Sequence, residues 1–153
     1  MSTNCSDKPP ELEERLKGLF SSQGLCVLST DFHGQPYSNL VAFTVTDNLQ
    51  SIIFATNRKT SKYSNALLNR KVAVLVDSRT NTRSDFDKAL AVTAIGIVEE
   101  VEGIQGKEYA RILISKHPSL ESFVHSESSA IMRVDVDLLI VASFNKTEVI
   151  NFR

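Results

Sequence analysis

The sequence predicts a mainly β domain of the α+β class, in which one antiparallel sheet closes into a barrel and short helices flank it. Most of the chain consists of short strand-like segments that turn residues separate. Helical spacing of apolar residues occurs in only a few short stretches. The 153 residues contain no linker or internal repeat. We therefore expect a single domain over residues 1–153, with residues 1–9 as a flexible tail.

The first predicted helix covers residues 10–22. Proline suits the first turn of a helix, and Pro10 stands at the expected start. Apolar residues from Leu12 to Phe20 recur at helical spacing, and Gly24 follows as a stop signal. We expect this helix to cover the barrel as a lid and to carry no site.

Three predicted strands follow and form an antiparallel meander over residues 25–30, 36–46 and 51–56. The segment Asp31–Gly34 supplies turn residues between the first two strands. Asp47-Asn48 separates the second strand from the third. Such short connections join neighbouring strands, so we expect these three to pair in order.

The middle of the chain carries a short helix and two further strands. Residues 60–69 begin with hydroxyl residues that can cap a helix and then present one apolar face. Residues 71–77 form a nearly continuous apolar strand, and residues 78–87 form a polar surface loop. Residues 89–101 form a long strand, in which Gly96 predicts a bulge or a barrel corner.

The C-terminal part contains one more helix and the last strands. Residues 104–117 have helical spacing and end before Pro118. Residues 119–129 are irregular, whereas residues 130–144 alternate with a clean period of two. Residues 149–152 can extend the pairing after a turn.

Charge and composition argue against several classes of protein. The formal net charge of −1 and the aromatic share of 7% disfavour a nucleic-acid or acidic membrane surface. No apolar run approaches the roughly 20 residues of a membrane-spanning helix. Residues 1–8 lack the apolar core of a signal peptide. Cys5 and Cys26 form neither a C-x-x-C pair nor a metal spacing, so we expect a cytoplasmic protein in which Cys26 is packed as a hydrophobe.

The histidines do not predict a metal site. His33, His117 and His125 lack the i, i+4 spacing and the cysteine or carboxylate companions of a metal centre. We therefore expect no metal. No nucleophile and base can be paired from residue order alone, so the sequence assigns no catalytic side chain.

The most informative segment is Phe54–Asn65, in which a strand ends and a loop with three cations leads into a helix. The first turn of a helix presents unpaired N–H groups and a partial positive charge. Thr60 and Ser61 would add hydroxyl donors, and Arg58 or Lys62 would add charge-assisted bonds to phosphate oxygens. The segment predicts a pocket for one phosphate monoester; a solvated basic loop capped by threonine is the alternative.

Several motifs stand in a fixed order between Leu12 and Phe144: L-C-V-L-S-T, D-x-H-G-x-P, F-A-T-x-x-x-x-S-K-x-x-N-A-L and K-V-A-V-L-V-D. In this order they resemble the pyridoxamine 5′-phosphate oxidase-like FMN-binding split-barrel family. The resemblance implies an antiparallel six-stranded Greek-key split β-barrel with flanking short helices. It also implies a homodimer that holds FMN at its interface.

The same resemblance implies which residues hold the cofactor. The family binds the FMN phosphate with residues that follow its third strand. The matching residues are Thr56, Thr60, Ser61 and Lys62. Asn65 lies one helical turn further, and Arg58 is the nearby cation. The second strand of the family runs under the flavin ring, and its matching residues are Ser38, Asn39, Leu40 and Val41.

The chain departs from the family where the substrate binds. Members that oxidise pyridoxamine phosphate carry an Arg at the start of the second strand and a Lys near its end. Here those places hold Ser38 or Asn39 and Phe43 or Thr44, and the chain has no Trp. The resemblance thus implies an FMN-dependent oxidoreductase that acts on a nicotinamide or another small molecule and not on pyridoxamine phosphate.

Other functions on the same barrel stay open. A non-catalytic protein that binds flavin, the deazaflavin F420 or haem is the alternative, with His125 as the candidate haem ligand. Arg79 and Arg83 could reach a cofactor phosphate from the 78–87 loop. The alternative is that both arginines are solvated surface residues.

Overall fold

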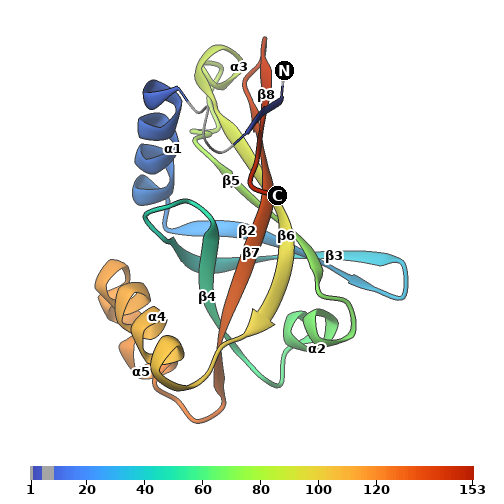
Figure 1. Cartoon of the computed structure of the whole chain (residues 1–153), viewed down its shortest axis with the longest axis vertical. Coiled ribbons are helices and arrows are strands. Elements are labelled where there is room, and N and C mark those ends of the chain that lie inside the picture. The colour runs from blue at the N-terminus through green and yellow to red at the C-terminus, as the bar shows by residue number, and fades with distance from the viewer. Residues whose placement is uncertain (1, 5–8) are drawn as a thin grey trace.

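The computed structural model describes residues 2–4 and 9–153, which form one strongly curved sheet with helices around it (Figure 1). The strands are β1 (Ser2–Asn4), β2 (Leu25–Phe32), β3 (Gln35–Val45), β4 (Ser51–Asn57), β5 (Lys71–Asp77), β6 (Ala91–Glu100), β7 (Ser129–Ala142) and β8 (Thr147–Asn151). The helices are α1 (Pro10–Ser22), α2 (Ser61–Leu68), α3 (Asp85–Lys88), α4 (Gly103–Lys116), the 3-10 turn η2 (Pro118–Leu120) and α5 (Glu121–Val124).

Six strands close into a barrel in the order β7-β4-β3-β2-β5-β6, because β6 pairs back onto β7. The strands β2, β3 and β4 form the meander, and β5 returns to lie beside β2, which is the Greek-key arrangement. Closure removes the free edges that an open sheet would expose. The prediction of an antiparallel six-stranded Greek-key barrel with flanking short helices is confirmed. The strand β8 adds to β7, and β1 pairs in parallel with β8.

Alternating side chains fill the barrel. The inward residues include Phe43, Phe54 and Met132, each at most 1% exposed. Helix α1 has the predicted bounds, and its residues Leu12 and Leu16 belong to the same core cluster. Burial of these side chains holds α1 against the barrel, as expected of a lid.

Gly96 marks the predicted bulge. The pairing of β6 with β7 shifts register between Ile95 and Gly96. A Cβ at Gly96 would lie 2.2 Å from the backbone oxygen of Asp135, so the two strands approach too closely for any side chain. Glycine is therefore required here by the neighbouring strand.

Two segments predicted as irregular contain short helical turns. The 78–87 loop is held by Asp85, whose carboxylate accepts hydrogen bonds from the backbone N–H groups of Thr80 and Asn81, and α3 begins there. Residues 119–129 contain η2 and α5. Turns of three or four residues lack the repeated apolar spacing on which a helix prediction rests.

The structure tests part of the predictions for the cysteines, the N-terminal tail and membrane-spanning helices. Cys26 is buried, as predicted, and burial raises the pKa of its thiol to about 12. Cys5 and the rest of 5–8 lie outside the described residues, whereas residues 2–4 of the expected tail form β1. Among the described residues, no helix is both long and apolar enough to span a bilayer.

Candidate functional site

The barrel is split between β3 and β4. These two strands pair only from Phe43 to Val45, opposite Ile52–Phe54. Beyond that point, residues 35–42 of β3 pair with β2, and residues 55–57 of β4 pair with β7. The strands therefore diverge, as Figure 1 shows, and the facing edges of β3 and β4 have no strand between them. Unpaired backbone N–H and C=O groups at such an edge can bind a ligand.

A cavity of about 180 Å³ lies at this split. Strands β3 and β4, helix α2 and the α4–α5 region all contribute to its lining, which consists of Leu40, Val41, Ala42, Ala55, Lys62, Leu113, Leu120 and Phe123. The walls are apolar, and the one charged side chain among them is Lys62. Such a site suits a flat apolar group with an anionic end.

Helix α2 begins beside this cavity with a threonine cap. The Thr60 hydroxyl accepts a hydrogen bond from the backbone N–H of Tyr63 and donates one to the carbonyl of Asn57, 2.8 Å away. It also lies 3.0 Å from the hydroxyl of Thr56. Thr56 and Thr60 therefore hold the turn that presents α2, while the Ser61 side chain is exposed and Lys62 reaches the cavity.

The structure places Arg58 in an ion pair within the protein. Its guanidinium lies 2.5 Å from Oε1 of Glu100 and also donates to the carbonyls of Glu127 and Ser129. The Tyr63 hydroxyl donates to the other oxygen of Glu100, at 2.9 Å. The hydrogen bond to Glu100 is the main cause that raises the pKa of Arg58 and that of Tyr63. The guanidinium expected as a phosphate ligand is thus bound by protein acceptors and anchors the loop before α2.

Asn65, also expected in the site, is buried and donates to the hydroxyl of Thr30 on β2, 3.1 Å away. This bond ties α2 to the barrel wall. Neither Glu100 nor Thr30 could be found from the sequence, because each contact joins residues more than thirty positions apart.

The four residues expected under a ring lie on the open segment of β3, and their side chains alternate between its two faces. Leu40 is 61% exposed, whereas Val41 is buried. The Ser38 hydroxyl lies 3.0 Å from that of Ser29. The Asn39 oxygen Oδ1 is buried and has no hydrogen-bond partner among the described residues. The structure thus brings Leu40, Val41 and Lys62 to one cavity.

A second cavity, of about 380 Å³, lies between the start of α2 and the β2–β3 hairpin. It is lined by residues of the β2–β3 hairpin and of α2, namely Phe32, Gln35, Tyr37, Lys59, Thr60, Ser61, Ser64 and Asn65. Thr60 and Ser61 therefore face this cavity, which sequence reasoning did not anticipate. Phe32 and Tyr37 are exposed aromatic residues at the hairpin, and only the structure shows this exposure.

The remaining candidates are bonded within the protein or exposed. Arg79 forms an ion pair with Asp77, at 3.1 Å. His117 forms a hydrogen bond with the carbonyl of Phe43, and His125 ends α5 as an exposed residue. Within residues 2–4 and 9–153, no group of three or more His, Cys, Asp or Glu side chains could hold a metal ion.

Comparisons with known proteins agree with this architecture. A family model described as pyridoxamine 5′-phosphate oxidase matches residues 12–139. A pyridoxamine 5′-phosphate oxidase homolog of Schizosaccharomyces pombe is 32% identical over 89 residues, which are 53% of this chain and 47% of that protein. The match thus spans less than half of that relative.

Solved structures share the fold. The heme binding protein of Mycobacterium smegmatis has a TM-score of 0.82 at 11% identity, over 94% of this chain and 59% of that chain. A FAD-binding protein of Mesorhizobium loti has a TM-score of 0.62 at 18% identity, over 82% of this chain and 90% of that chain. At these identities the likeness shows the fold alone. Because the family model runs from α1 to β7 and so spans the barrel, this chain belongs to the pyridoxamine 5′-phosphate oxidase family.

Proposed function

We propose that the protein binds FMN at the split of the barrel and is a flavin-dependent oxidoreductase. The observation that carries the proposal is the split itself, where the open edge of β3, an apolar cavity and Lys62 meet beside the start of α2. Family membership supports a flavin, and the FAD-binding protein of Mesorhizobium loti has the same fold.

The residues present fit the two ends of FMN. The start of α2 offers backbone N–H groups, the exposed hydroxyl of Ser61 and the ammonium of Lys62 to a phosphate. The open edge of β3 at Ser38–Val41 offers backbone donors and acceptors to the polar edge of a ring, and Leu40 and Val41 offer apolar contact. Thr56, Arg58 and Asn65 act on the phosphate through the position of α2, since their side chains bind the protein.

When bound, FMN supplies hydride transfer chemistry. The chain's own residues then bind and orient it: Lys62 balances the phosphate charge, and the β3 edge fixes the ring. The apolar lining excludes water from the same cavity. No side-chain acid or base is assigned, because this chemistry does not require one.

We also propose that two copies of the chain meet over the outer face of the sheet. One row of residues runs in register across β3, β2, β5, β6 and β7, and we call it the outer band: Leu40, Val27, Leu75, Thr93 and Ile140. Its neighbours along each strand point into the core, so the band faces outward. The band begins at Leu40, which also lines the cavity at the split, so a second copy would deepen that cavity. A contact of this kind would give two equal sites.

The proposed substrate is a nicotinamide or another small reductant, and the proposed compartment is the cytoplasm. Pyridoxamine phosphate is disfavoured because the second strand carries no cation at Ser38, Asn39, Phe43 or Thr44, and Phe43 is fully buried.

The test is the visible absorption spectrum of the purified protein after addition of FMN and removal of the excess. The expected result is a retained flavin spectrum at about one FMN per chain. The Ser61→Ala, Lys62→Ala double variant should lose most of this flavin, whereas Lys107→Ala, on the exposed face of α4, should retain it. A protein that stays colourless with excess FMN contradicts the proposal. An intense Soret band after addition of hemin would then favour haem, and a single band near that of free F420 would favour the deazaflavin.

A further inference from the structure

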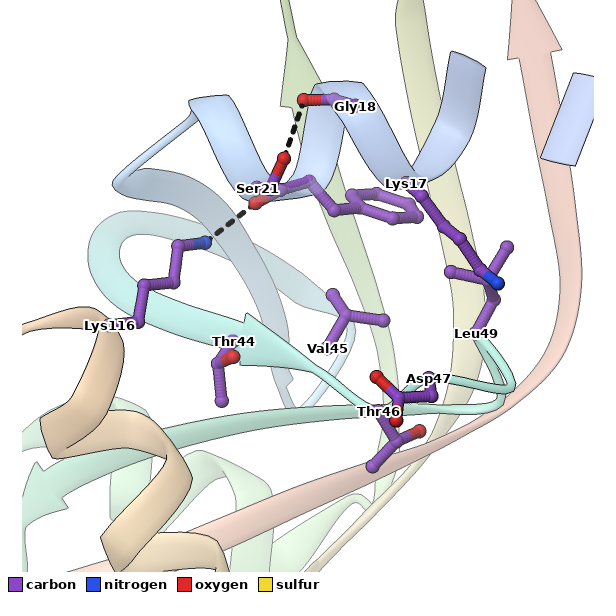
Figure 2. A pocket seen from close by; sticks show the side chains of 10 residues that line it. Lys17, Gly18, Ser21, Thr44, Val45, Thr46, Asp47, Leu49 and Lys116 are labelled. Atoms are coloured by element: carbon purple, nitrogen blue, oxygen red, sulfur yellow. Dashed lines mark hydrogen bonds between the residues drawn. The ribbon is translucent and has the colours of Figure 1, made fainter. Parts of the chain in front are cut away.

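A third cavity lies between α1, the end of β3 with the β3–β4 turn, and the end of α4 (Figure 2). Its volume is about 430 Å³, within the range of cavities that hold small organic ligands. No residue of this cavity lines the split or the second cavity. The proposed FMN site therefore leaves it unexplained.

Phe20, Val45 and Leu49 form the apolar part of the wall of this cavity. Gly18 forms part of the α1 wall, and a Cβ at this position would meet nothing within 4 Å. Glycine inside a helix costs about 0.5 to 1 kcal/mol relative to alanine, and neither packing nor a positive φ requires it here. Because Gly18 is exposed, its contribution to this wall comes from its backbone.

The polar end of the cavity is formed by Lys116 and Thr44. The Lys116 ammonium donates to the carbonyl of Phe20 at 2.6 Å and lies 3.9 Å from the centre of the Phe43 ring. The carbonyl uses one of its three N–H donors. No carboxylate among the described residues forms an ion pair with Lys116, and burial lowers its pKa to about 8. Thr44, only 9% exposed, lines the same cavity.

The other charged groups at the cavity are exposed or paired. Lys17 forms an ion pair with Glu13 at 3.0 Å, and Asp47 is exposed to solvent on the turn. Figure 2 shows Lys116 and Thr44 together on one side of the cavity, away from Lys17 and Asp47. A half-buried ammonium without a counter-charge favours an anion next to it, because burial without a partner is costly.

We propose that this cavity binds a small organic carboxylate with an apolar body. The carboxylate would accept charge-assisted hydrogen bonds from Lys116 and a hydrogen bond from Thr44. The apolar body would lie against Phe20, Val45 and Leu49. This inference does not depend on the proposed flavin function, because the two sites share no residue.

The test is isothermal titration calorimetry of the full chain with 4-phenylbutyrate as the probe and 4-phenylbutanol as its uncharged analogue. The expected result is saturable one-to-one binding of the acid, at least tenfold tighter than that of the alcohol. Lys116→Met, which keeps the length of the side chain, should weaken binding of the acid at least tenfold. Val45→Phe, which enlarges an apolar side chain of the cavity wall without a change of charge, should abolish binding of both compounds.

The matched control is Lys107→Met, which removes an exposed lysine from the same helix and should leave the affinity unchanged. Saturation with FMN should also leave it unchanged. Equal binding of acid and alcohol, no saturable binding, or an unaltered affinity in Val45→Phe would overturn the proposal. If circular dichroism shows that Lys116→Met does not fold, the acid–alcohol comparison and Val45→Phe decide the outcome.

Discussion

Gly96 is the position at which one methyl group should cost the most. Its Cβ would lie 2.2 Å from the backbone oxygen of Asp135, and backbone in a closed barrel cannot move aside easily. We expect Gly96→Ala to lower the free energy of unfolding by about 2 to 3 kcal/mol. Gly18→Ala is the control and should raise it by about 0.5 to 1 kcal/mol, because open space and a helical backbone surround that residue. Urea denaturation measures both, and an unchanged midpoint for Gly96→Ala would contradict the close approach of β6 and β7.

Lys116 should make stability depend on pH at the alkaline end. Burial lowers its pKa from 10.5 to about 8, so between these values the unfolded chain binds a proton that the folded chain does not. The free energy of unfolding contributed by this group therefore rises with pH from about 8 to about 10.5. Because the side chain is only half-buried, we expect a rise on the order of 1 kcal/mol.

The nearby Cys26 thiol acts in the opposite direction above pH 9. Its pKa is raised from 9.0 to about 12, so the unfolded chain loses that proton first and stability falls. Lys116 and Cys26 shift each other's pKa, so denaturation of Cys26→Ala and of the Cys26→Ala, Lys116→Met double variant at each pH isolates the lysine. A difference between the two that stays flat from pH 8 to 10.5 would show that Lys116 keeps its ordinary pKa.

At the scale of the element, the start of α2 separates structural hydroxyls from ligand-facing groups. The Thr60 hydroxyl caps the helix and contacts Thr56, whereas the Ser61 side chain is exposed. We expect Thr60→Val to lower the free energy of unfolding by about 1 kcal/mol and Ser61→Ala to leave it nearly unchanged. Both should weaken FMN binding, the first through the position of α2 and the second through a lost phosphate contact. Thermal melts of the flavin-free protein and fluorescence titration with FMN measure the two effects, and equal melting temperatures would refute the division of roles.

At the scale of the whole molecule, the outer band should decide the oligomeric state. Leu40 is 61% exposed and begins the band, and Ile95, 36% exposed, lies in the next row. We expect the double variant Leu40→Glu, Ile95→Glu to be monomeric, because like charges without partners oppose burial of this face. Ile104→Glu is the control, since Ile104 is 90% exposed on α4, away from the sheet. Light scattering coupled to size-exclusion chromatography measures the mass, and a wild-type protein that elutes as a monomer would remove the proposed interface.

Most of the longer helices and strands could be predicted from the sequence, because these elements depend on local spacing and on turn residues. The α1 helix, the period of two in β7 and the bulge at Gly96 all follow from the order of residues along the chain. The family could also be predicted from the sequence, since its motifs are contiguous. The partners of the individual side chains could be learned only from the tertiary structure. It pairs Arg58 with Glu100 and leaves Lys116 over the Phe43 ring without a counter-charge. These contacts form when a closed barrel brings distant strands and helices together, and their energy depends on burial, which residue order does not specify.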